Sequence, residues 1–89
     1  MSEKHTKVVN IHFPLTPKEL AQGIGDLRYD ALQEFLRELA DKLYADAKKD
    51  GKGGRLKLEE SLAHVANSVE DAYVCMYDVW DICEPHEVD

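Results

Sequence analysis

Side chains that could take part in chemistry gather at the C-terminus of the chain. The segment YVCMYDVWDICEPHEVD (73–89) holds both cysteines, the single tryptophan, two of the four tyrosines and one of the four histidines. Cys75 and Cys83 are eight residues apart, about 12 Å along a helix, whereas a disulfide needs Cα atoms within about 7 Å. Cys83 and His86 have a spacing that suits a shared metal, but a zinc site needs four ligands. We therefore predict no metal, no cofactor and two reduced cysteines that pack as small apolar side chains.

A second possibility is a metal-dependent hydrolase built from helical carboxylates. Glu34, Glu38 and Asp41 have the spacing with which all-helical hydrolases hold Mg²⁺. They lie on the side of their predicted helix opposite to its leucines, so they are expected to face solvent instead of a neighbouring helix. Glu60 and His64, one turn apart, also lie off the predicted helix contact. We predict no catalytic residues, and a metal-dependent hydrolase is the third hypothesis for this chain.

A glycine-rich segment between the predicted long helices carries the main basic cluster. GKGGR (51–55) lacks the preceding strand and the GxxxxGK[ST] spacing of a phosphate-binding loop, so we interpret it as a helix-to-helix turn. The cations around it are Lys48, Lys49, Lys52, Arg55 and Lys57. This basic cluster is suited to meet an acidic helix of another copy of the chain.

Charge is distributed very unevenly along the chain. Its 89 residues have a formal net charge of −7, and all eleven Lys and Arg lie within residues 1–57. Residues 58–89 contain nine Asp and Glu and no Lys or Arg. Because phosphate binding needs a basic face, direct binding of nucleic acid is not expected. No apolar run is long enough for a membrane span and no signal peptide is evident, so we predict a cytoplasmic protein. A bacterial or phage source is a separate expectation.

The N-terminal part of the chain predicts a strand followed by a short helix. Apolar residues alternate with polar ones in VVNIHFPL (8–15), which indicates a strand at about residues 7–13. TPKEL (16–20) has the capping threonine, the proline and the glutamate that mark a helix start, and it predicts a helix at about residues 17–24. Two glycines then end this helix, and Asp26 is a candidate cap for the next one.

Two long helices follow. Leucines that recur at three and four residues predict one at about residues 27–48, with Gly51 as its C-cap. A second helix is predicted at about residues 57–83, ended by Pro85 and followed by a tail at residues 84–89. Its predicted core positions form a heptad seam of Leu58, Leu62, Val65, Val69, Ala72, Met76, Val79 and Cys83.

Together these elements predict a mainly α fold with a small β component, in a single domain over residues 1–89. The two long helices should form an antiparallel αα-hairpin. A hairpin buries only one stripe of each helix, and a lone strand leaves its backbone groups unpaired. Both arguments favour completion of the fold by a second copy in a homodimer. The partner of the strand is left open between that second copy and residues 55–58 of the same chain.

The C-terminal half of the last predicted helix is the candidate contact surface. Its sequence AYVCMYDVWDIC (72–83) is apolar nearly all round, broken only by Asp78 and Asp81. Such a helix is normally covered on more than one side, which predicts either a dimer interface or a groove for another protein. The predicted interface comprises Tyr73, Val74, Met76, Tyr77, Trp80 and Ile82, together with Ile11 and Phe13 of the strand. The predicted acidic face comprises Glu60, Glu70, Asp71, Asp78 and Asp81.

These patterns favour a small protein-interaction module without catalytic activity. We predict a homodimer that binds another protein through its acidic, aromatic C-terminal helix, with Tyr73, Tyr77 and Trp80 as anchors. The alternative is an acidic inhibitor that imitates nucleic acid and acts on a DNA- or RNA-handling enzyme, of the type carried by phages or mobile elements. Binding that weakens steeply with salt would distinguish this alternative.

Overall fold

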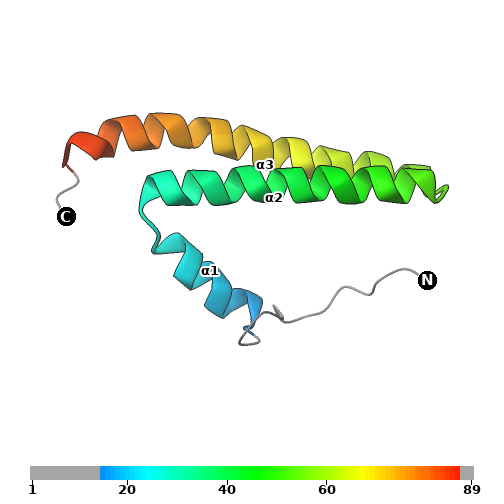
Figure 1. Ribbon diagram of the computed structural model, residues 1–89, viewed down its shortest axis with the longest axis horizontal. Helices are drawn as coiled ribbons and strands as arrows, with labels where there is room; N and C mark the ends of the chain where they lie inside the picture. The colour runs from blue at the N-terminus through cyan, green and yellow to red at the C-terminus, as the bar shows by residue number, and fades with distance from the viewer. Residues whose placement is uncertain (1–14, 87–89) are drawn as a thin grey trace.

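The chain folds into a helical hairpin with a short helix at its base. The structure, a computed structural model, describes residues 15–86. Its elements are α1 (Pro17–Gly25), α2 (Tyr29–Lys52), α3 (Leu56–Cys83) and the 3₁₀ turn η1 (Glu84–His86). Figure 1 shows α2 and α3 running side by side in opposite directions, while α1 leaves the start of α2 and diverges from the hairpin.

The mainly α class and the antiparallel hairpin are therefore confirmed. The strand predicted at residues 7–13 lies outside the described residues, and residues 15–86 contain no strand. None of the helices in the described part of the chain is long and apolar enough to cross a bilayer. The helix predicted at residues 17–24 ends one residue later, and the long α3 has nearly the predicted bounds.

The start of α1 has the capping box that its sequence predicts. The backbone N–H of Glu19 donates to the Thr16 hydroxyl at 3.2 Å, and the backbone N–H of Thr16 donates to the Glu19 carboxylate at 3.0 Å. This backbone hydrogen bond, followed by one from the hydroxyl, lowers the pKa of Glu19. The carboxylate's contribution to the cap is therefore complete above its unfolded pKa and is lost as pH falls through the lowered folded value.

Replacement of the capping residue should loosen α1 alone. Thr16→Ala removes the side-chain acceptor, which costs a helix about 1 kcal/mol, so amide exchange within α1 should accelerate about fivefold. The midpoint of global unfolding should not move, because α1 is not packed along the hairpin. Hydrogen exchange followed by mass spectrometry measures both effects, with Thr16→Ser as the control that keeps the hydroxyl. A lower global midpoint in Thr16→Ala would show instead that α1 is part of the cooperative hairpin.

The turn between the long helices differs from its prediction. Gly51 lies inside α2 instead of capping it, because the helix continues to Lys52 and ends on Gly53. Gly54 has a φ of 88°, a left-handed conformation that suits glycine. The turn is closed by Arg55, whose backbone N–H donates to the Asp50 carbonyl at 3.0 Å and whose guanidinium binds the Asp50 carboxylate at 3.2 Å.

The other end of α2 also begins differently from the prediction. Asp26 ends α1 instead of capping α2, and its backbone N–H donates to carbonyls of α1. The residue before the first turn of α2 is Arg28, whose side chain makes no capping hydrogen bond. Its guanidinium instead binds the Asp30 carboxylate through two hydrogen bonds of 2.7 and 2.8 Å.

Small side chains form the contact between α2 and α3. The apolar residues that are buried in residues 15–86 are Ala40 and Ala47 on α2 and Ala66 on α3, at 3, 3 and 0 % exposure. Gln33, one heptad before Ala40, is also buried, and its amide donates to the Tyr73 carbonyl at 3.4 Å. No large side chain in this part of the chain is fully buried. The two backbones can therefore approach closely, but the larger apolar residues remain partly open to solvent.

The seam of α3 is rotated relative to the predicted one. Half of the predicted positions, Leu62, Val69, Met76 and Cys83, are indeed half-buried against α2. The other half of the contact is made one residue later than predicted, by Glu59, Ala66, Tyr73 and Trp80. The predicted Leu58, Val65, Ala72 and Val79 are exposed, and we call these four residues the outer stripe. Because α3 has apolar residues at three positions of every heptad except the first, where Glu59 stands, periodicity alone allowed two neighbouring seams.

Candidate protein-binding surface

The C-terminal half of α3 exposes large apolar side chains, as its sequence predicts. Val74, Tyr77 and Ile82 are 54, 48 and 73 % exposed. Cys75 is exposed as well, which corrects its predicted burial, whereas Cys83 is half-buried. Cys75 belongs to neither the predicted nor the observed seam, so it lies on a side of α3 that α2 does not cover. This end of the helix is therefore an apolar surface that the hairpin does not cover.

Four exposed residues in this half of α3, two apolar and two acidic, share one face of the helix. Val74, Tyr77, Asp78 and Asp81 are exposed and follow the spacing i, i+3, i+4, i+7, which aligns side chains along one side of a helix. We call this group the Tyr77 patch. Its composition, two apolar side chains beside two carboxylates, fits a contact with an apolar centre and a charged rim.

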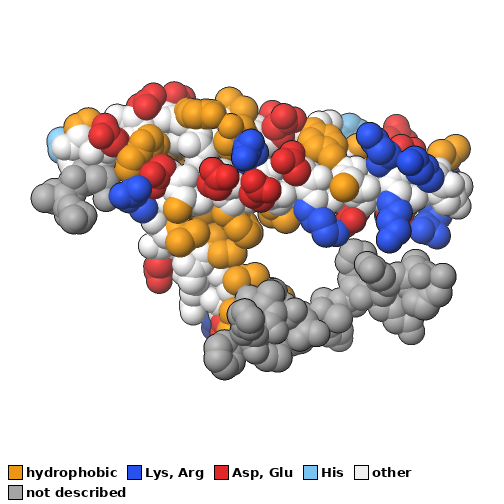
Figure 2. Space-filling view, viewed as in Figure 1, with side chains coloured by type: hydrophobic (Ala, Val, Ile, Leu, Met, Phe, Trp, Pro, Cys, Tyr) orange, Lys and Arg blue, Asp and Glu red, His pale blue; other side chains and the backbone are white. Residues whose placement is uncertain are grey.

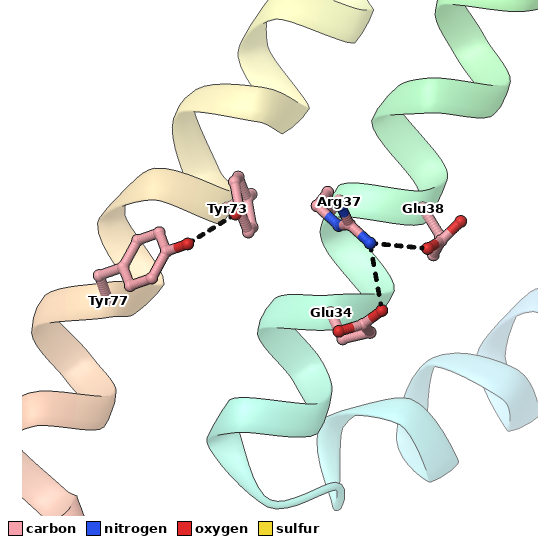
Figure 3. Close-up of polar contacts among 5 residues, drawn as sticks. All are labelled: Glu34, Arg37, Glu38, Tyr73 and Tyr77. Atoms are coloured by element: carbon pink, nitrogen blue, oxygen red, sulfur yellow. Dashed lines mark hydrogen bonds and ion pairs between the residues drawn. The ribbon is translucent and has the colours of Figure 1, made fainter.

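Tyr77 is held in place by its neighbour Tyr73. The two rings pack edge to face with centroids 5.4 Å apart, and their hydroxyl oxygens are 2.7 Å apart (Figure 3). This hydrogen bond, with some burial, raises the pKa of Tyr73. Tyr73 itself is half-buried in the hairpin seam, so it positions the more exposed ring of Tyr77.

The facing side of α2 has its own charged network. The Arg37 guanidinium binds the carboxylates of Glu34 at 3.4 Å and of Glu38 at 3.3 Å, and Figure 3 shows this cluster across the hairpin from the tyrosine pair. The two carboxylates raise the pKa of Arg37. All three side chains are exposed, so such ion pairs contribute little to stability and mainly add charge to this side of the molecule.

Trp80 has a structural role in the hairpin. Its ring is half-buried in the seam of α3, and the Arg28 guanidinium lies over it at 5.4 Å from the ring centroid. Met76 is half-buried in the same seam. Trp80 therefore ties the C-terminal end of α3 to the start of α2, a contact that its position in the sequence did not reveal. Of the other predicted interface residues, Ile11 and Phe13 lie outside the described residues.

The acidic side chains of α3 are all at the surface. Glu60, Glu70, Asp71, Asp78 and Asp81 are exposed. Glu70 accepts a hydrogen bond of 2.9 Å from the Tyr44 hydroxyl, which also contacts the Asn67 side chain. The hydrogen bond to this carboxylate raises the pKa of Tyr44. Glu70 is thus engaged within the hairpin, whereas Asp78 and Asp81 share their face of α3 with Val74 and Tyr77.

A second apolar surface, which sequence reasoning missed, lies where α1 meets α2. Figure 2 shows apolar side chains gathered at this junction. They line an open groove of about 400 Å³ formed by Pro17, Leu20, Ala21, Ile24, Gly25, Leu32, Phe35 and Leu36. The signal was available, because Leu20 and Ile24 are one turn apart on α1, but their target depends on the angle at which α1 leaves α2.

The basic cluster lies at the opposite end of the hairpin. Lys48, Lys49, Lys52, Arg55 and Lys57 are exposed around the turn, where Figure 2 shows the cations crowded together. The first three line a shallow groove of about 550 Å³ with Asp41, Tyr44 and Ala45. One end of the hairpin is therefore basic and the other is acidic and aromatic.

The carboxylates considered for metal binding do not converge on one site. Glu34, Glu38 and Asp41 are exposed, and among residues 15–86 no three His, Cys, Asp or Glu side chains lie close enough to hold a metal ion.

Comparison of the chain with protein-family models, with curated proteins and with solved structures finds no match.

Proposed function

We propose that this chain is a protein-interaction module without catalytic activity, which acts as a homodimer and binds a basic protein surface through the Tyr77 patch. The proposal rests on one observation above all. Val74 and Tyr77 are about half exposed on a side of α3 that the hairpin leaves uncovered, and Asp78 and Asp81 share their face.

The side chains of the Tyr77 patch indicate the kind of protein surface that it would bind. Tyrosine is enriched at the centres of protein interfaces because it offers a large rigid apolar area and a polar tip. Tyr77 meets this description, because the hydrogen bond to Tyr73 already fixes its ring. The two aspartates would repel an acidic partner and favour lysine or arginine at the rim. A short amphipathic basic helix or a basic ridge of a folded protein has the required complementarity.

Replacement of Tyr77 tests the proposal directly. Wild-type chain on a resin should capture a set of proteins from a lysate of its source cell, and Tyr77→Ala should lose a specific member of that set. With that protein purified, calorimetry should show a dissociation constant raised about 30-fold, the effect expected for loss of a central tyrosine. Ser68→Ala is the matched control, because Ser68 is exposed on α3 but lies outside the patch.

Salt dependence separates this proposal from its alternative. Binding that centres on Tyr77 should change only modestly between about 0.15 and 0.5 M salt, because added salt screens the two aspartates at the rim and not the apolar contact at the centre. Affinity that collapses over this range and is indifferent to Tyr77→Ala would support the acidic nucleic-acid imitator instead. Capture of the same proteins by Tyr77→Ala and wild type would contradict the Tyr77 patch as the binding surface.

A further inference from the structure

The outer stripe is a row of exposed apolar residues along most of α3, on a side that α2 does not cover. Its members are spaced by seven residues, so the stripe extends over 22 residues, from 58 to 79, and about 31 Å of helix. Leu58 and Val65 are 47 and 49 % exposed, and Val79 is 37 % exposed. An apolar residue at every seventh position, beside a second such series already used by the hairpin, is the pattern of a helix that packs against two neighbours.

The outer stripe shares its side of the hairpin with apolar residues of α2. The hydrogen bond between Tyr44 and Glu70 places these two residues on one side of the contact between the helices. In an antiparallel pair, the positions that flank the seam opposite to them are Leu32 and Leu39 on α2 and the outer stripe on α3. Leu32 and Leu39 are half-buried. This side of the hairpin is therefore apolar along the first half of α2, and the next heptad position is Asp46, which binds Lys42. Tyr77 lies on the other side, with Tyr44 and Glu70.

The outer stripe is complementary to the outer stripe of a second copy when the two α3 helices are antiparallel. Leu58 and Val79 are equidistant from the point midway between Ser68 and Val69, and so are Val65 and Ala72. Two α3 helices packed antiparallel about this point would place Leu58 against Val79 of the second copy and Val65 against its Ala72. An interface related by a two-fold axis needs this self-complementarity, in which residue i meets j and j meets i.

The distribution of charge along the hairpin favours the same antiparallel orientation. The basic cluster surrounds the turn end of the hairpin, whereas residues 70–86 contain Glu70, Asp71, Asp78, Asp81 and Glu84 and no Lys or Arg. Antiparallel α3 helices bring the basic end of each copy over the acidic end of the other. A parallel arrangement would stack two basic clusters, each with five cations, which is electrostatically unfavourable.

We infer that a second copy of this chain covers the outer stripe, with the two α3 helices antiparallel about a two-fold axis between Ser68 and Val69. This inference deepens the homodimer of the proposed function and specifies its geometry. It leaves the Tyr77 patch outside the self-contact, so that the dimer presents two copies of the patch to partners.

Disulfide trapping tests both the face and the direction. In a Cys75→Ala, Cys83→Ala background, the double variant Val65→Cys with Ala72→Cys should form a covalent dimer on mild oxidation. The two new cysteines cannot bridge within one chain, since seven residues separate them by about 10 Å along the helix. Val65→Cys alone should remain uncrosslinked, because its mate in the second copy is Ala72. Self-crosslinking of Val65→Cys alone, or no covalent dimer from the double variant, would overturn the antiparallel register.

A charge placed in the outer stripe tests the contact without a disulfide. Val65→Asp should raise the dimer dissociation constant about 30-fold, because the two-fold axis places the change twice in the interface. His64→Asp is the matched control, since His64 is also exposed but points away from the outer stripe. Sedimentation equilibrium at 0.15 and 1 M salt gives the constants, and circular dichroism checks the helix content. Equal assembly of Val65→Asp and wild type, or a wild-type monomer at 0.1 mM, would refute the proposed dimer.

Failure of this inference is distinguishable from failure of the proposed function. Tyr77→Ala should leave disulfide trapping intact even if no partner protein depends on the Tyr77 patch. Conversely, a monomeric chain whose capture of a partner requires Tyr77 would overturn the antiparallel dimer and leave the binding surface in place.

Discussion

Ala66→Leu should lower the free energy of unfolding by about 3 kcal/mol, the upper end of the range for overpacking a tight core. Ala66 is fully buried and lies in the seam where α3 meets α2, whose own buried apolar residues are Ala40 and Ala47. The close approach of the two helices depends on these small side chains. A leucine adds three carbon atoms where no space exists, so the helices must separate and the half-buried leucines beside them lose contact.

The matched control is Ala45→Leu, because Ala45 is exposed on α2 and a leucine there meets solvent. Its free energy of unfolding should stay within about 0.5 kcal/mol of wild type. Urea unfolding followed by circular dichroism, at one fixed protein concentration, measures both variants. Equal stability of Ala66→Leu and Ala45→Leu would show that α2 and α3 are not held at the spacing that the alanines set.

Trp80→Ala is expected to destabilise the hairpin by about 2 kcal/mol and to lower the midpoint of thermal unfolding by about 10 °C. Truncation of a fully buried tryptophan costs about 3 to 5 kcal/mol, and the ring of Trp80 is half-buried in the seam. The variant also loses the contact with the Arg28 guanidinium, which at an exposed site contributes about 0.5 to 1 kcal/mol. Calorimetry or thermal circular dichroism provides the measurement.

The comparison with Tyr77→Ala separates a structural role from a binding role. Tyr77 is 48 % exposed and lies one turn before Trp80, so its loss should reduce the thermal midpoint much less. Trp80→Ala should therefore weaken partner capture only in proportion to the loss of folded hairpin, with binding restored at low temperature. A Trp80→Ala protein with wild-type stability and no partner binding would make Trp80 an anchor, as the sequence alone predicted.

Local signals in the sequence predicted the elements well. The capping box at Thr16 and Glu19 depends on side chains three residues apart, and it is present with both hydrogen bonds. The bounds of α1 and α3, and the antiparallel pairing of α2 with α3, also follow from periodicity and a short glycine turn. The exposure of Val74, Tyr77 and Ile82 followed from a helix whose apolar residues exceed what one neighbour can cover.

The predictions that proved wrong concern residues that can take either of two local roles at similar energy. A glycine can end a helix or be tolerated within it at a cost of about 1 kcal/mol, and Gly51 is tolerated because the turn closes later through Asp50 and Arg55. Asp26 can cap a following helix or end a preceding one, and the angle between α1 and α2 gives it the second role. The environment of Cys75 was misjudged because a cysteine outside the seam is buried only where another element covers that side of α3.

Periodicity thus determines that α3 is a long helix with an excess of apolar surface, because each turn needs only its own residues to form. It does not determine which of two adjacent seams is used. That choice belongs to the tertiary structure, in which Ala66 is fully buried and Trp80, two heptads later, is half-buried in the same series. The same rotation leaves Leu58, Val65, Ala72 and Val79 outside the hairpin.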